Sequence, residues 1–191
     1  GNLGTPFISL LDQEPPEYRV LEISSFQMEA TRSFNPWIAI ILNITPDHLD
    51  RHKSFDQYAG LKEKIYQNQT YKDFLILNHD DPKTNSLGGS CLAKKIFFSL
   101  KNEMETGCYI KQGKIFAHIN KFEGEVFSLK SLSRGLRWQI ENVLPAVATA
   151  LLLEVPLASI KKVLESFTGL EHRLEWVCSQ DGIDYINDSK G

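Results

Sequence analysis

In the first part of the chain, short runs of apolar residues alternate with segments whose apolar residues recur at helical spacing. Residues 18–23 and 73–77 have the pattern of short strands, and residues 37–42 form a continuous apolar run that is typical of a strand buried on both faces. Residues 54–68 have apolar positions at helical spacing behind Ser54, a residue type that caps helices. Strand, helix and strand in this order indicate parallel βαβ units.

The pattern changes over residues 96–129, where short strand-like pieces are broken by glycines, which favours an antiparallel meander at the edge of the sheet. The later elements are predicted as helices over 139–154 and 156–167, a hinge at 168–170, and strands over 173–178 and 183–186 joined by a turn at 180–182. The whole pattern predicts an α/β fold, with a Rossmann-like, mostly parallel sheet, helices on both faces and an antiparallel hairpin excursion.

Composition narrows the class of protein. The 191 residues are 42% hydrophobic and 24% charged, which is ordinary for a globular domain. The net charge of −3 leaves no broad basic surface, so neither nucleic acid nor a membrane is an expected partner. No apolar run approaches the ~20 residues of a transmembrane helix. Three scattered cysteines without a CxxC spacing predict neither a disulfide framework nor a cysteine zinc site, and they favour the cytoplasm.

Two familiar motifs are absent from the sequence. There is no GxxxxGK[ST] loop to cradle phosphates and no GxSxG nucleophile elbow. The chain also starts without methionine and stops directly after a strand-like run. We therefore expect a piece of a longer protein.

The first candidate site follows the strand predicted at 18–23. Glu22, Ser24 and Ser25 lie where that strand would end, and ligands of open parallel sheets bind at this edge. The alternative is a loop glutamate followed by a helix-capping serine, and by itself the segment favours this alternative.

The second candidate site follows the apolar run 37–42. Asp47, His48, Asp50 and Arg51 come within a few residues of each other. Carboxylates and a neutral imidazole can bind a divalent metal, and an arginine can hold a phosphate. The alternative, a polar turn, is weighted equally. We interpret His52, His79 and His118 as surface histidines.

Lys62 occupies an unusual position in the helix predicted at 54–68. At about 100° per residue it falls about 20° from Phe55, within the apolar stripe, whereas Lys64 falls on the opposite, solvated face. A buried ammonium is costly unless it is paired, so Lys62 is a candidate for contacting an anion or reacting as a neutral amine. The equally weighted alternative is a packed stem with the amine in water.

Two further groups of polar residues are weaker signals. Gln139 and Asn142 stand three residues apart near the start of a helix, where paired amides can read a purine edge. The better interpretation without other information is an ordinary polar helix start. Asp188 and Lys190 follow the last predicted strand and are candidate nucleotide contacts.

Several of these segments, in this order, closely resemble the Mur ligases, and the segment LEISSFQ resembles the branch of that family that adds D-glutamate. The resembling segments are residues 1–4 (GNLG), 21–27 (LEISSFQ), 43–51 (NITPDHLDR), 167–173 (FTGLEHR) and 187–190 (NDSK), with the helix around Lys62. Only residues 86–131 match weakly. The resemblance implies that residues 1–169 are a central ATPase domain without its P-loop and that residues 170–191 are the first strands of a C-terminal ligase domain.

The resemblance also implies an activity. UDP-N-acetylmuramoyl-L-alanine and D-glutamate would be joined with ATP and Mg²⁺ through an acyl phosphate, by a cytoplasmic monomer that makes peptidoglycan precursors. This chain alone would be inactive without the phosphate cradle. The resemblance implies that Asn2 and Ser24 bind the muramoyl substrate and that Glu22, His48 and Lys62 hold Mg²⁺. It implies that His48 and Lys62 are catalytic, with Lys62 carbamylated by CO₂. It also implies that adenine is contacted by Asn142 and by Gln139, where the family has asparagine, and that nucleotide and phosphate are contacted by Arg173, Asp188 and Lys190.

Three other functions stay open at this point. A folate-type ligase of the same superfamily would differ in the LEISSFQ segment. A metal-dependent phosphoesterase built on Glu22, Asp47, His48 and Asp50 would need no ATP and would leave Lys62 unexplained. The third is a non-catalytic chain, either a structural module that binds nucleotide only weakly or a degenerate gene product.

Overall fold

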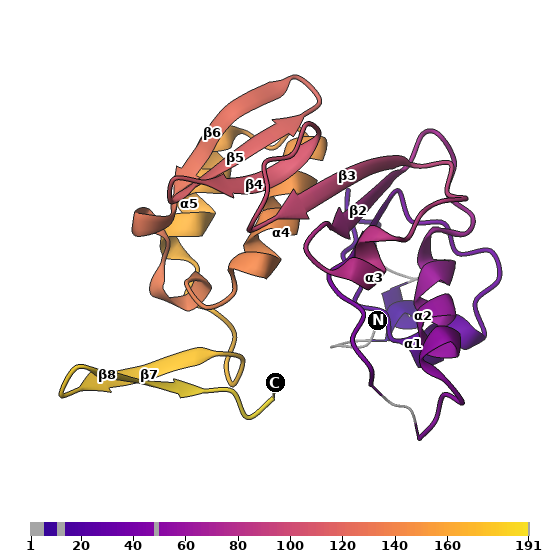
Figure 1. Ribbon diagram of the computed structural model, residues 1–191, viewed down its shortest axis with the longest axis horizontal. Coiled ribbons are helices and arrows are strands. Elements are labelled where there is room, and N and C mark those ends of the chain that lie inside the picture. The colour runs from indigo at the N-terminus through magenta and orange to yellow at the C-terminus, as the bar shows by residue number, and fades with distance from the viewer. Residues whose placement is uncertain (1–5, 11–13, 48–49, 191) are drawn as a thin grey trace.

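A single six-stranded sheet forms the centre of the computed structural model, which describes residues 6–10, 14–47 and 50–190 (Figure 1). Its strands lie in the order of the sequence, and β1 to β4 run parallel, whereas β4, β5 and β6 form an antiparallel meander. The strands are β1 (Ile38–Ile41), β2 (Phe74–Asn78), β3 (Lys94–Ser99), β4 (Gly107–Lys111), β5 (Lys114–Ile119) and β6 (Phe122–Ser128). The predicted fold class is confirmed, including the antiparallel excursion at one edge.

Helices cover both faces of the sheet, and the alternation of side chains along β2 explains why. Leu75 and Leu77 belong to one apolar cluster with residues of α2, whereas Ile76 belongs to a second cluster with residues of α4. Burying each such side chain contributes roughly 1.5–3 kcal/mol. The α-helices are α1 (Ser25–Glu29), α2 (Phe55–Glu63), α3 (Pro82–Asn85), α4 (Ile140–Leu152) and α5 (Leu157–Ser166), and short 3₁₀ helices span Phe7–Leu10, Lys64–Tyr66, Leu129–Ser131 and Arg134–Leu136.

The C-terminal segment forms a separate hairpin of β7 (Glu175–Gln180) and β8 (Ile183–Asn187). Its turn places Asp181 and Gly182 at positive φ, as a tight Asp-Gly hairpin turn requires. The guanidinium of Arg134 lies 4.1 Å from the centre of the Trp176 ring and ties the hairpin to the main body. The predicted pair of strands at the C-terminus is therefore confirmed.

One predicted strand is not formed. Residues 18–23 run as irregular chain and pair with no strand in the described part of the molecule. Val20 is 98% exposed, although the apolar pattern predicted burial. A strand needs a neighbouring edge to satisfy its backbone groups, and no local pattern guarantees one. No helix among the described residues is long and apolar enough to cross a membrane.

Candidate functional site

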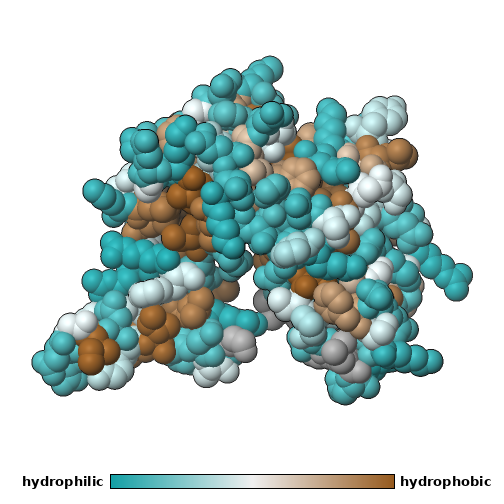
Figure 2. Space-filling view, viewed as in Figure 1, coloured by the Kyte–Doolittle hydropathy of each residue, from teal (hydrophilic) through white to brown (hydrophobic). Residues whose placement is uncertain are grey.

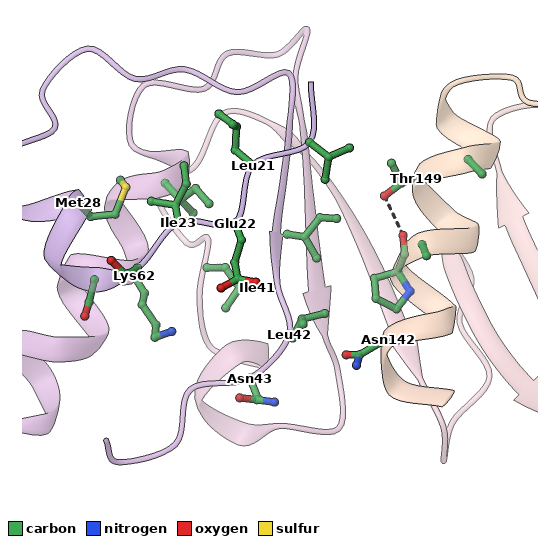
Figure 3. Close-up of a pocket in the computed structure, with 18 of the residues that line it drawn as sticks. Leu21, Glu22, Ile23, Met28, Ile41, Leu42, Asn43, Lys62, Asn142 and Thr149 are labelled. Atoms are coloured by element: carbon green, nitrogen blue, oxygen red, sulfur yellow. Dashed lines mark hydrogen bonds between the residues drawn. The ribbon is translucent and has the colours of Figure 1, made fainter. Parts of the chain in front are cut away.

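A cavity of about 710 Å³ lies between the irregular segment 20–25, the end of β1, and helices α2 and α4. Glu22, Asn43, Lys62 and Asn142 all line it. Figure 3 shows that Glu22 and Lys62 point toward the same space, with Asn142 facing them from α4. The cavity therefore brings together four polar side chains that come from four separate parts of the sequence.

The short helix α1 forms one wall of this cavity. Its cap is Ser24, whose Oγ accepts a hydrogen bond from the backbone N–H of Gln27 at 3.3 Å, while Gln27 Oε1 accepts one from the Ser24 N–H at 2.9 Å. Ser24 also lines the cavity, as does Ser25. The helix-capping alternative for Ser24 is what the structure shows, and its position at the cavity is compatible with a second role.

Lys62 is half-buried, and its Nζ lies 5.0 Å from the centre of the Tyr58 ring. The prediction that Lys64 is solvated is wrong. Lys64 is also half-buried, and its Nζ donates hydrogen bonds to the carbonyl oxygens of Met28 at 3.2 Å and Glu29 at 3.3 Å. The helical projection fails there because α2 ends at Glu63 and Lys64 starts a tighter 3₁₀ turn.

The polar loop after β1 is only partly described. Asn43 lines the cavity, whereas His48 and Asn2 lie outside the described residues. Arg51, a candidate phosphate ligand, pairs instead with Glu29, with 2.9 Å between Nη2 and Oε2. Among residues 6–10, 14–47 and 50–190, no three His, Cys, Asp or Glu side chains gather as a metal site. The carboxylates predicted for a phosphoesterase centre thus do not form one among themselves.

His52 is buried, not at the surface as predicted. Its side chain is 1% exposed, and its Nε2 lies 3.0 Å from Ser25 Oγ. The ring stacks on Phe26, with 5.3 Å between ring centres, and packs against Tyr58 at the same distance. No local pattern signals this burial, because the partners come from different helices. His79 and His118 are half-buried rather than fully exposed.

The predicted nucleotide residues do not all reach the cavity. Asn142 lines it, but Gln139 uses its Nε2 to donate to the carbonyl of Arg173 at 3.0 Å. At the base of the hairpin, Asp188 Oδ1 accepts the N–H of Leu174 at 3.0 Å, and the Lys190 N–H donates to the carbonyl of His172 at 3.0 Å. Arg173, Asp188 and Lys190 therefore lie together there, and they are not among the residues that line the cavity.

Comparisons with known proteins find relatives along the whole chain. The chain is 41% identical over 192 aligned positions to a UDP-N-acetylmuramoylalanine--D-glutamate ligase of Caldanaerobacter subterraneus, and 40% identical over 191 to one of Koribacter versatilis. Each alignment covers all of this chain and 42% of the relative, so the chain spans less than half the length of these proteins.

Solved structures show the same fold at lower identity. A pseudomurein peptide ligase type C from Methanothermus fervidus and MurF from Acinetobacter baumannii each superpose on 81% of this chain with a TM-score of 0.58, at 22% and 23% identity. The superposition covers 38% and 34% of those chains. The sequence pattern of the Mur ligase middle domain matches residues 3–150. This chain therefore belongs to the Mur ligase middle-domain family.

Proposed function

We propose that the full-length protein joins D-glutamate to UDP-N-acetylmuramoyl-L-alanine at the expense of ATP. One observation carries the proposal: relatives named for this reaction are 38–41% identical to the chain along its whole length. The location of Glu22 and Lys62 on one cavity supports it, because these residues belong to two separate segments of the resemblance.

The reaction makes an amide from a carboxylate. The carboxylate of the substrate attacks the γ-phosphate of ATP and gives an acyl phosphate and ADP. The D-glutamate amine then attacks the acyl carbon, and phosphate leaves. Negative charge accumulates on the phosphoryl oxygens during the first step, so positioning and charge neutralisation are the main demands on the protein.

Glu22, His48 and Lys62 are the residues that we propose to hold Mg²⁺, which neutralises phosphate charge when bound. Among the described residues that line the cavity, Glu22 supplies the one carboxylate that could bind Mg²⁺, so the ion would need further protein ligands. The neutral amine of Lys62 adds to the carbon of CO₂, an N–C bond forms and a proton is released. The resulting carbamate gives the cavity its second carboxylate, and His48 supplies the imidazole.

The remaining roles follow the same proposal. Asn2 and Ser24 bind the muramoyl substrate, Asn142 and Gln139 contact adenine, and the hairpin base with Arg173, Asp188 and Lys190 contacts the nucleotide. Residues 1–169 would then be the central ATPase domain, and residues 170–191 the start of the C-terminal domain. We further propose a cytoplasmic monomer.

Product formation by the full-length protein tests this function. ADP and phosphate release should require both UDP-N-acetylmuramoyl-L-alanine and D-glutamate, and mass spectrometry should find the amide. Dependence on glycine or L-glutamate, on a pteroate acceptor, or hydrolysis without ATP would contradict the proposal. The 191-residue chain alone should bind ATP–Mg²⁺ too weakly for calorimetry, and clear binding would contradict the need for a phosphate cradle.

A further inference from the structure

The buried side chain of His52 connects two segments that both contribute to the cavity. It follows the polar loop 43–51 and precedes α2, whereas its partner Ser25 is the first residue of α1. Glu29 Oε1 lies 3.9 Å from His52 Nδ1. Ser25 Oγ and His52 Nε2 share a hydrogen bond whose direction is set by the tautomer of the ring.

Helix α1 depends on such contacts for its position. It has five residues, and isolated helices shorter than about 12 residues are marginal in water. Residues 51–64 hold it at both ends: His52 bonds Ser25 at its start, while Arg51 and Lys64 bind Glu29 and the last carbonyls. Of these contacts, only the His52–Ser25 hydrogen bond is between two buried residues.

The start of α1 continues directly into the cavity wall. Ser24 caps the helix, and Glu22 stands two residues before it on the cavity. We propose that His52 is a positioning residue, which holds the first turn of α1, and with it Glu22 and Ser24, against the segment that leads into α2 and Lys62. The inference rests on the function proposed above, but it concerns how the cavity wall is held and not which reaction occurs.

The substitution His52→Phe in the full-length protein removes the hydrogen bond and retains an aromatic ring between Phe26 and Tyr58. We expect kcat/KM for the UDP-linked substrate to fall about 10- to 100-fold, because small displacements of positioning groups cost this much. KM for that substrate should rise about fivefold, since a loss of folded protein would lower only kcat. Hydrogen exchange of the backbone amides of residues 25–29 should accelerate about tenfold or more.

Ser25→Ala removes only the other partner of the hydrogen bond, and it decides the question if His52→Phe does not fold. Its effect on kcat/KM should match that of His52→Phe, and the double variant should be no less active than the less active of the two single variants. His118→Phe is the matched control. His118 lies on β5, and its half-buried ring is likewise in contact with an aromatic side chain: it lies edge-on to Tyr109, whose hydroxyl is 3.5 Å from Nε2.

The inference is overturned if His52→Phe changes kcat/KM and exchange no more than His118→Phe does, or if the effects of the two single variants multiply. A wild-type protein without ligase activity would refute the proposed function. Exchange over residues 25–29 would then still decide whether His52 holds α1, because that measurement needs no substrate.

Discussion

The contact between Gly135 and the chain leading to the C-terminal hairpin gives a sharp test of the structure. A Cβ atom on Gly135 would lie 2.2 Å from the carbonyl carbon and oxygen of Thr168 and 2.5 Å from the nitrogen of Gly169. Ordinary contacts begin at 3.4 Å, so the two segments would have to separate by about 1.2 Å. Both are backbone, and no change of rotamer relieves the overlap.

We therefore expect Gly135→Ala to destabilise the full-length protein by about 1–3 kcal/mol, the usual cost of overpacking. The melting temperature should fall by roughly 2–10 °C. The neighbouring Arg134 stacks on Trp176, so the shift should also loosen the hairpin and speed amide exchange there. Gly60→Ala is the matched control, because no atom lies within 4 Å of that Cβ and the site is inside α2.

Alanine in a helix interior is favoured over glycine by roughly 0.5–1 kcal/mol, so Gly60→Ala should raise the melting temperature. Differential scanning calorimetry of both variants makes the comparison. A Gly135→Ala protein that melts within about 1 °C of wild type would refute the reasoning, because so close a contact cannot accept a methyl group without cost.

Three further predictions concern single side chains of the full-length protein. Lys62→Ala should slow amide formation by about 100-fold or more, with partial rescue by added formate, whereas Lys72→Ala at an exposed turn should change the rate less than about twofold. Burial raises the pKa of the Cys108 thiol to about 12, so a thiol reagent at pH 8 should label exposed Cys178 and reach Cys108 only after unfolding. Burial, with a hydrogen bond to the Glu63 carboxylate, raises the pKa of the Tyr66 phenol. Its contribution to stability is present below pH about 10 and is lost as the pH rises further, so Tyr66→Phe should flatten the fall in melting temperature above that pH.

Elements with a strong local signal were predictable from the sequence. The apolar run 37–42 contains β1, and Ser54 caps α2 through a 3.2 Å hydrogen bond from the Gln57 N–H. The hairpin turn at Asp181-Gly182 was equally readable, since few residues accept positive φ at both positions. These features depend on neighbours within a few residues, and such neighbours are visible in a sequence.

The errors concern contacts between distant segments. Residues 18–23 had a strand pattern but found no strand to pair with among the described residues. His52 looked like a surface residue because its partners, Ser25 and the two aromatic rings, lie on α1 and α2. The hydrogen bond from the Gln139 side chain to the carbonyl of Arg173 was not predictable either, because the two residues are 34 positions apart. Glu22, Lys62 and Asn142, each singled out in the sequence, line one cavity, but the contacts that hold its walls were not predictable from the sequence.

The contacts of Lys64 affect how a loss of activity in lysine variants near the end of α2 must be interpreted. From helical periodicity alone, Lys64 would be chosen as the control position for Lys62, yet its amine donates hydrogen bonds to two carbonyl oxygens at the end of α1. Removing it should loosen the same wall that His52 holds at the other end, so Lys64→Ala should also lower activity. A loss of rate alone therefore does not identify a metal ligand. Carboxylate rescue separates the two cases, because a small acid can replace a missing carbamate at Lys62 but cannot donate hydrogen bonds to helix carbonyls.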